Sequence, residues 1–335
     1  RRVSVADQSG RAQQILLPTF LENLRFFFNY QVRHMYFRYF MWNFAGRQND
    51  IQGHGEVHKG NWISGIPFID NWMYGDQEPL PDSLKNNPAR NKYYLLPLLL
   101  GILGLAFQSG AGTKGKRDFW VVMLLFFFTG LAIVLYLNQT PLQPRERDYA
   151  YAGSFYAFAI WIGLGVLPVI KALRRLLPGE AAVALGTALT LVLVPLNMAA
   201  ENWDDHDRSQ RTIARDLAFN YLNTVGENGV IFTNGDNDTF PLWYAQEVEG
   251  VRTDVRVANL SYLQTDWYID QMKRKAYLSD PLPISMEHDQ YVVGKRDMVH
   301  VLDRIEGDVD LKRAIDFLAR DDERSKTIPG YNQRL

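Results

Sequence analysis

Residues 119–137 of the chain read FWVVMLLFFFTGLAIVLYL, an apolar run without a charged side chain. About 20 such residues in a helix cross the roughly 30 Å hydrocarbon core of a bilayer. Three further uncharged runs occupy residues 93–108, 151–170 and 181–200. Four such runs separated by short polar links are hard to accommodate as buried helices of a soluble domain. The sequence therefore predicts four transmembrane helices within residues 93–200.

The charge of the chain is divided unevenly between its two parts. Residues 1–200 contain 19 Lys and Arg against 12 Asp and Glu, whereas the remainder contains 17 against 25. This imbalance indicates different surroundings for the two parts. Basic residues cluster only in short loops, which excludes a nucleic-acid partner. The absence of cysteine excludes a disulfide framework, a thiolate zinc site and a cysteine nucleophile.

Basic residues in the short links orient the membrane region, because cytoplasmic loops retain Lys and Arg. The links after the first and third predicted helices contain Lys114, Lys116, Arg117, Lys171, Arg174 and Arg175. The link after the second helix, NQTPLQPRERDY at 138–149, balances its two Arg with two acids, and the fourth helix runs into the acidic ENWDDHD. We therefore predict that the link at 138–149 and all of residues 201–335 face outward.

Residues 20–44 (FLENLRFFFNYQVRHMYFRYFMWNF) are dense in aromatics but also carry charges. Residues Glu22, Arg25, Asn29 and Arg33 follow one another at spacings of 3, 4 and 4, which predicts one polar stripe on an otherwise apolar helix. Charged groups at membrane depth normally face a protein interior or a wet cavity, so this helix would line a site. Alternatively, it lies at the membrane interface with its Arg side chains reaching phospholipid headgroups.

The segments around this helix are predicted to be polar connections. Residues 1–19 form an N-terminal connecting segment. Residues 45–92 form an outward loop rich in Gly, Asn, Asp and Pro. Within this loop, His54, Glu56 and His58 are spaced by two, but such scatter is common in polar loops, and we expect no metal there.

The sequence after residue 200 alternates between helical and strand patterns, with apolar β-forming runs at 230–233 and 254–260. This alternation predicts a soluble α/β domain with a small parallel sheet over residues 201–280. Ligands of such sheets collect beyond the carboxyl ends of the strands, where the sequence DNDTF would lie as a polar turn. Its residues Asp236, Asn237 and Asp238 are candidates for binding, or ordinary turn and cap residues. Residues 281–335 are predicted to be a loop-rich extension with one helix near 310–320.

Three segments together resemble a known family: RQND at 47–50, QPRERDYAYAGSFYAFAIW at 143–161, and FTNGDNDTFPLWYAQEVEGVRTDVRVANLSYLQTDWYIDQMKRKAY at 232–277. The chain is similar to bacterial members of glycosyltransferase family 117, inner-membrane proteins of Gram-negative bacteria related to the eukaryotic transmembrane protein O-mannosyltransferase. The resemblance implies a GT-C type enzyme that transfers a mannose-like sugar from a polyprenyl-phosphate donor to Ser or Thr of exported proteins. It also implies an inner-membrane location with the domain after residue 200 in the periplasm, and no cofactor.

Family members are longer than this chain, with a multi-span module preceding the region found here. In GT-C enzymes the catalytic acidic residue typically lies in the first outward loop of that module. The resemblance therefore implies that the chain is a fragment and that its catalytic base lies upstream of Arg1.

Transfer from a lipid phosphate leaves a phosphate that must be stabilised, a task suited to the planar fork of arginine. The residues predicted to bind the donor phosphate are Arg145, Arg147, Arg25, Arg33 and Arg38. Those predicted to bind substrate or organise loops are Arg47, Asn49, Asp50, Glu146, Asp148, Asp236, Asn237 and Asp238. Alternatively, the four charged residues at 145–148 neutralise one another and fix the loop over the helix bundle.

Two other functions remain open. In the first, the chain is a noncatalytic membrane-anchored module whose α/β domain binds exported proteins or envelope glycans. The second, a transporter, is disfavoured because the four predicted helices contain no ionisable residue of the kind that marks a translocation site. The enzyme hypothesis expects the five arginines to converge on one cavity, and the module hypothesis expects them to be dispersed or paired with acids.

Overall fold

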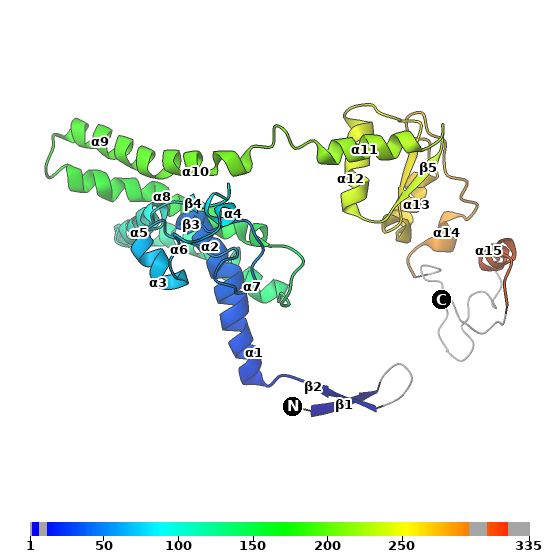
Figure 1. Ribbon diagram of the computed structural model, residues 1–335, viewed down its shortest axis with the longest axis horizontal. Helices are drawn as coiled ribbons and strands as arrows, with labels where there is room; N and C mark the ends of the chain where they lie inside the picture. Colours follow the sequence, from blue (N-terminus) through cyan, green and yellow to red (C-terminus); the bar gives the residue numbers. More distant parts are fainter. Residues whose placement is uncertain (1, 7–11, 295–306, 321–335) are drawn as a thin grey trace. The chain divides into compact units, whose positions relative to one another are not determined.

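The computed structural model describes residues 2–6, 12–294 and 307–320. The chain divides into two compact units, Arg1–Asp207 and Arg208–Leu335, which are described separately below (Figure 1). The first unit contains the membrane helices. The second contains the α/β domain.

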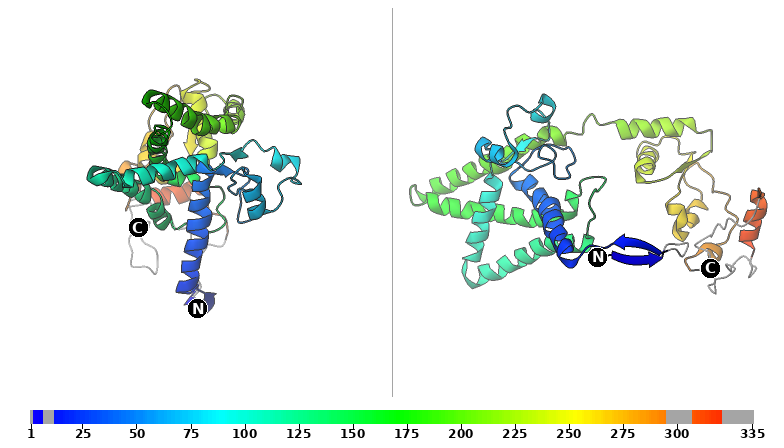
Figure 2. Two further views of the ribbon diagram at one scale, coloured as in Figure 1. Left: turned by 90° about the vertical axis from the view of Figure 1, so that its left-hand side faces the viewer. Right: turned by 60° about the horizontal axis from the view of Figure 1, so that its bottom comes forward.

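A long helix from Phe20 to Phe44 follows an antiparallel hairpin of β1 (Arg2–Ala6) and β2 (Ala12–Leu16). It consists of α1 (Phe20–Phe26), a π-helical stretch η1 (Phe27–Phe37) and α2 (Arg38–Phe44). Thr19 and Glu22 cap its start reciprocally. No residue of α1 is buried, whereas nearly all of α2 is, so the N-terminal half of the helix projects from the first unit (Figures 1 and 2).

The polar stripe predicted on this helix lies on its exposed side. Glu22, Arg25, Asn29 and Arg33 are all exposed, whereas Arg38 is buried. The helix therefore buries an arginine that does not belong to the stripe.

Residues 45–95 form an outer layer with little regular structure. They contain the short antiparallel pair β3 (Gly46–Arg47) and β4 (Asn91–Lys92) and the helices α3 (Pro67–Tyr74) and α4 (Asp82–Lys85).

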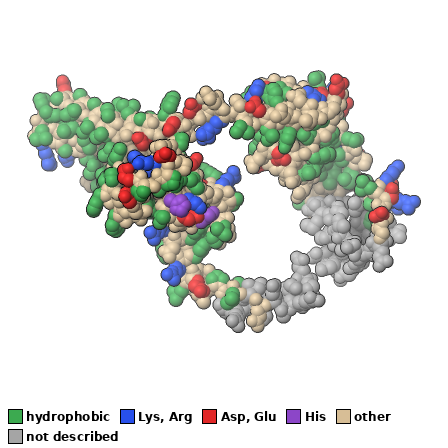
Figure 3. Space-filling model, in the orientation of Figure 1, with side chains coloured by type: hydrophobic (Ala, Val, Ile, Leu, Met, Phe, Trp, Pro, Cys, Tyr) green, Lys and Arg blue, Asp and Glu red, His purple; other side chains and the backbone are tan. Residues whose placement is uncertain are grey.

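Three stretches of the first unit are long and apolar enough to cross a membrane: Gly112–Leu137, Asp148–Leu173 and Gly179–His206. The first contains α6 (Gly112–Phe128) and α7 (Leu131–Leu137), and the second contains the turn η2 (Asp148–Tyr151) and α8 (Ala152–Leu173). The third joins α9 (Gly179–Leu191), the π-helical η3 (Val192–Leu196) and α10 (Asn197–His206). These helices expose many large apolar side chains, as expected of lipid-facing surfaces (Figure 3).

The first of the four predicted spans forms a shorter helix, α5 (Leu96–Ser109). Tyr94 and Leu95 adopt positive φ angles of 55° and 60°, so the helix begins only after them, with Pro97 in its first turn. The 14 residues of α5 are fewer than the roughly 20 that a perpendicular span requires.

Glycines allow α5 to pack closely against α8. A Cβ on Gly104 would lie 1.8 Å from the carbonyl oxygen of Trp161, and one on Gly165 would lie 2.1 Å from that of Leu100. Trp161 also donates a 2.8 Å hydrogen bond from Nε1 to Oε1 of Gln108. Because apolar side chains gain little by leaving lipid, such close backbone packing is a main source of attraction between membrane helices.

We expect Gly104→Ala to destabilise the first unit by about 1–3 kcal/mol, because the added methyl group overlaps backbone atoms of α8. Thermal unfolding of the full-length protein in detergent would measure this. Gly163→Ala is the matched control, since within the described residues a Cβ at Gly163 of α8 would meet no atom within 4 Å beyond its chain neighbours and the nearby backbone of its own helix. Equal melting temperatures for the two variants would contradict the role given to Gly104.

The second unit is the predicted α/β domain. A parallel pair, β5 (Val230–Thr233) and β6 (Arg256–Asn259), aligns Val230 with Arg256. The helices α11 (Ile213–Thr224) and α12 (Asp236–Glu247) cover one face of this pair through Ala218, Leu222, Leu242 and Ala245. The turn η4 (Tyr262–Gln264) and α13 (Asp266–Met272) follow, and Tyr268 and Met272 pack with Ala258 on β6. Two helices, α14 (His288–Tyr291) and α15 (Leu311–Ala319), lie in the extension.

The segment DNDTF, predicted to be a turn, is instead the first turn of α12. The carboxylate of Asp238 accepts hydrogen bonds from the backbone N–H groups of Asn234 and Gly235, at 2.9 and 3.0 Å. This cap stabilises the helix from Asp236 onward, so the prediction of a polar turn at DNDTF was wrong.

Candidate functional site

A buried ion pair joins three distant segments of the first unit. Arg38, the first residue of α2, binds both carboxylate oxygens of Glu146, which lies in the loop between α7 and η2. The distances are 3.1 Å from Nη1 to Oε1 and 2.7 Å from Nη2 to Oε2. The two side chains are only 5% and 15% exposed, so solvent screens this pair weakly.

Further hydrogen bonds reach both side chains of the pair. Arg38 donates from Nε to the carbonyl of His34 at 2.9 Å and from Nη1 to the carbonyl of Gly60 at 2.7 Å. Glu146 also accepts from the hydroxyl of Tyr39 and from the backbone N–H of Gly53 at 3.2 Å. The pair therefore connects the long helix, the loop 45–92 and the link 138–149.

Gly60 lies at a closely packed point of the loop 45–92, where a side chain has no room. Its φ is +54°, and a Cβ would lie 2.6 Å from the carbonyl oxygen of Ile51 and 3.2 Å from Nη1 of Arg38. Only glycine allows both this backbone conformation and this approach.

The environment keeps Glu146 ionised. Burial of its carboxylate acts to raise its pKa, but the hydrogen bonds and charge of Arg38, with those from Tyr39 and Gly53, outweigh burial. The pKa of Glu146 therefore lies below its ordinary value.

Neighbouring polar residues of the loop 45–92 are engaged in organising it. Oδ1 of Asn49 accepts from the N–H groups of Ile51 and Gly60 at 3.2 and 2.8 Å. Arg47 stacks its guanidinium over Trp42 at 4.2 Å and donates from Nε to the carbonyl of Asn49. Through these contacts Arg47 and Asn49 hold the backbone of the loop 45–92 in place.

Two further predicted loop residues are more exposed. Asp50 is exposed and accepts from the amide of Asn87 at 3.0 Å. Glu56 accepts from the N–H of His54 and forms a half-exposed ion pair with Lys59. Within the described residues, no group of three or more His, Asp or Glu side chains is arranged to hold a metal ion.

Arg145 and Arg147 flank Glu146 but do not share its carboxylate. Arg147 donates from Nε to Gln143 at 3.1 Å and from Nη1 to the hydroxyl of Tyr149 at 3.0 Å. Its backbone N–H donates to the hydroxyl of Tyr39 at 3.1 Å. Arg145 is exposed, with its guanidinium 5.9 Å from the centre of the Tyr149 ring.

The charges of these two arginines are not matched by a carboxylate. In the described part of the chain, the ion pairs of the site are Arg38 with Glu146 and Lys59 with Glu56. Neither Arg145 nor Arg147 lies within 4.0 Å of an acidic group there, and Asp148 also forms no such pair. The self-neutralising cluster considered at 145–148 is therefore not the arrangement observed.

The other predicted donor-phosphate residues differ in position. Arg25 and Arg33 are on the exposed side of the long helix, whereas Arg38 is committed to Glu146. The structure therefore brings Arg38, Arg147 and Glu146 together and leaves Arg25 and Arg33 outside this group. The five arginines do not converge on one cavity, contrary to what the enzyme hypothesis expects.

The predicted residues of the second unit lie at the start of α12. Asp238 is used as a cap, whereas Asn237 is exposed and Asp236 accepts from the hydroxyl of Tyr262 at 3.3 Å. They lie beyond the carboxyl end of β5, as predicted.

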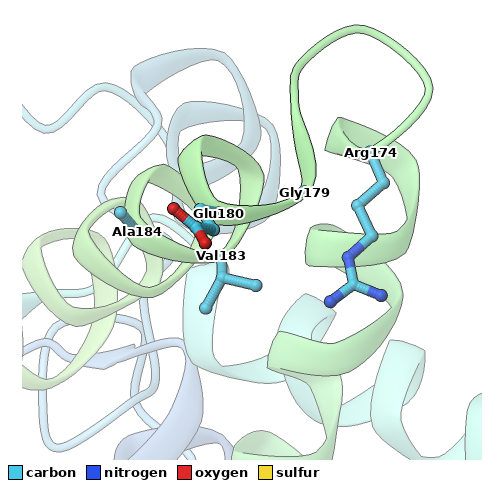
Figure 4. A pocket seen from close by; sticks show the side chains of 5 residues that line it. All are labelled: Arg174, Gly179, Glu180, Val183 and Ala184. Atoms are coloured by element: carbon cyan, nitrogen blue, oxygen red, sulfur yellow. The ribbon is translucent and has the colours of Figure 1, made fainter.

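A surface hollow at the turn between α8 and α9 contains none of the predicted site residues. It is lined by Arg174, Gly179, Glu180, Val183 and Ala184 (Figure 4). The hollow follows the C-terminal end of α8, whereas the link 138–149 precedes the N-terminal end of this helix. The hollow therefore lies at the opposite end of the helix bundle from that link.

No direct sequence signal marks Tyr39, Gly53 and Gly60, which complete the ion-pair site. Tyr39 is one of many aromatics in the long helix, and the two glycines are in a glycine-rich loop. The sequence did contain an indication of Arg38, because this charged residue lies just outside the regular polar stripe.

We expect Glu146→Gln to destabilise the full-length protein by about 3–5 kcal/mol, because it leaves Arg38 buried without a counter-charge. Glu146 has a lowered folded pKa, so its contribution is present above its unfolded pKa, near 4.5, and is lost as pH falls through the folded value. Melting temperatures between pH 3 and 7 would measure both effects, and the wild-type protein should lose more stability on acidification than the variant.

Glu56→Gln is the control for this prediction, since its pair with Lys59 is half exposed and should matter little. A Glu146→Gln variant as stable as Glu56→Gln would show that the buried pair is not needed.

Comparison with known proteins assigns the second unit. Residues 214–334 match the family model of TMEM260-associated domain 2. No curated protein and no solved structure shows significant similarity to the chain. The chain is therefore a multi-pass membrane protein that carries a TMEM260-associated domain.

Proposed function

We propose that the chain is part of a GT-C type membrane glycosyltransferase that transfers a sugar from a polyprenyl-phosphate donor to Ser or Thr of exported proteins. The resemblance of residues 143–161 and 232–277 to glycosyltransferase family 117 suggests the reaction. The observation that carries the proposal is the pair of guanidiniums at Arg145 and Arg147, neither of which forms an ion pair with a carboxylate of the described residues.

The geometry of Arg147 suits a phosphate that carries growing negative charge. Gln143 and Tyr149 orient its guanidinium through neutral groups, so its positive charge stays available to an anion. The Arg38–Glu146 pair and Tyr39 fix the backbone from which it projects. A donor that is positioned before the reaction stabilises developing charge without reorganisation.

This proposal gives Arg38 a supporting role. Its three nitrogens are all used, on His34, Gly60 and Glu146, so a phosphate would have to displace a buried carboxylate to reach it. Arg38 therefore positions the loop, and the donor phosphate binds Arg145 and Arg147. The catalytic base is supplied by the module that precedes this region in the family.

Hydrogen bonds between the segments predicted to face outward support placing these segments on the same side of the membrane. Gly53 of the loop 45–92 binds Glu146 of the link 138–149. Asn91, at the end of the same loop, donates to Oδ1 of Asn202 at 2.9 Å, near the end of α10. These three segments therefore share one end of the helix bundle, and we place that end in the periplasm of a Gram-negative inner membrane.

The first test replaces each arginine by lysine, which keeps the charge but loses the fork. We expect Arg147→Lys or Arg145→Lys to lower single-turnover transfer of labelled sugar by the full-length protein. Loss of a charge-assisted contact made in the transition state removes about 2–4 kcal/mol, or roughly 30- to 1000-fold in rate.

The control is Arg117→Lys, an exposed arginine in the N-terminal part of α6, which should transfer at the wild-type rate. Unchanged melting temperatures in the lysine variants would separate lost chemistry from lost folding. Wild-type transfer rates in both Arg145→Lys and Arg147→Lys would refute the donor-phosphate role and favour the noncatalytic module.

The second test concerns topology. A reporter active only after export, fused after Leu335, should be active, whereas the same reporter inserted between Gly112 and Lys114 should be inactive. The reason is that short loops rich in Lys and Arg stay in the cytoplasm. The opposite pattern would place the second unit inside and remove exported proteins as acceptors.

A further inference from the structure

The second unit contains a buried arginine without a counter-charge. Arg256 begins β6 and is 5% exposed, between Val255 and Val257, whose side chains pack into the core beneath α11 and α12. Since side chains alternate along a strand, Arg256 lies on the opposite face. Its Nη2 donates to the carbonyls of Arg274, Ser279 and Asp280, at 2.7, 3.3 and 3.0 Å.

One nitrogen of this guanidinium is not satisfied. Nε of Arg256 is buried and has no hydrogen-bond partner. Among the described residues, no acidic side chain lies within 4.0 Å of it, although Asp280 provides its carbonyl oxygen. Burial lowers the pKa of Arg256, and the nearby Tyr268 and Asp280 oppose this only in part. A buried charge compensated by neutral carbonyls alone is costly, and a bound anion would relieve that cost.

Arg256 lines a cavity of about 230 Å³. Its walls include the apolar side chains of Trp243 and Met272 and the polar side chains of Thr253 and Gln271. Apolar walls with a few polar groups at fixed positions are typical of small-ligand sites. The volume suits a molecule of about the size of a single sugar or benzene ring.

The charges around the cavity indicate how much negative charge a ligand can carry. Arg256 supplies one buried positive charge, whereas Glu247, which also lines the cavity and accepts from the hydroxyl of Tyr277, is exposed, so water screens its negative charge. A dianionic phosphate monoester would leave an uncompensated charge in a partly desolvated site. A carboxylate carries one charge and matches the planar guanidinium.

We propose that this cavity binds a small organic monocarboxylate through Arg256. The ligand's carboxylate accepts hydrogen bonds from the guanidinium, and its body packs against Trp243 and Met272. This site lies within the second unit and does not depend on the proposed transfer reaction or on Arg145 and Arg147.

The test compares matched carboxylate and neutral probes on the full-length protein, by calorimetry and thermal shift. Glucuronate is compared with glucose, and benzoate with benzyl alcohol, while glucose 6-phosphate tests the dianion. We expect at least one carboxylate to bind and to raise the melting temperature, its neutral counterpart to bind at least 10-fold more weakly, and glucose 6-phosphate to bind more weakly than glucuronate or benzoate.

Three variants connect binding to this cavity. Arg256→Lys should weaken carboxylate binding at least 10-fold through loss of the fork. Ala276→Phe fills the cavity from its rim and keeps Arg256, so it tests the site even if Arg256→Lys unfolds. Arg215→Met removes an arginine that pairs with Glu249 outside the cavity, and it should leave binding unchanged.

Several outcomes would overturn the proposal. These are failure of both carboxylates to bind, equal binding of the neutral probes, wild-type binding in Ala276→Phe, or tighter binding of glucose 6-phosphate. The last result would show a phosphate site in place of a carboxylate site.

Discussion

The arrangement of the first unit depends on the ion pair between Arg38 and Glu146. Desolvating two charges is expensive, and this cost is offset by further hydrogen bonds from Arg38 to the carbonyls of His34 and Gly60 and to Glu146 from Tyr39 and Gly53. The pair therefore contributes more to the positions of the segments that it connects than to the free energy of folding. The pair holds the loop 45–92 and the link 138–149 on the same end of the long helix. Arg147 owes its fixed position to this arrangement.

Composition was enough to predict the membrane helices, because a bilayer accepts only long apolar segments whose backbone is satisfied internally. The parallel sheet was also predictable, since β5 and β6 are short apolar runs separated by a helical pattern. The length of α5 was not, because it depends on the positive φ angles of Tyr94 and Leu95, residues that rarely adopt them. The start of α12 was missed for a similar reason: Asp238 caps the helix from inside the segment that looked like a turn.

Side-chain partners were harder to predict than helices and strands. Residues 145–148 alternate in sign, which suggests pairing between neighbours, yet Glu146 binds an arginine 108 positions away. Neighbours in an extended link point in different directions, so sequence proximity gave the wrong partner for Glu146. Arg256 gave a signal that could have been used. It is a charged residue at the start of β6 with Val255 and Val257 on either side, a position where a charge is expensive.

The environments of Arg38, Arg147 and Arg256 decide what each guanidinium can bind. The charge of Arg38 is matched by a buried carboxylate, so a second anion gains little there. Arg147 has neutral partners and is half-buried, so water screens its charge only in part. Arg256 also has neutral partners, but it is buried, so the same charge acts through a lower effective dielectric. A lipid phosphate that must leave after each turnover therefore suits Arg147, and a ligand that is retained suits Arg256.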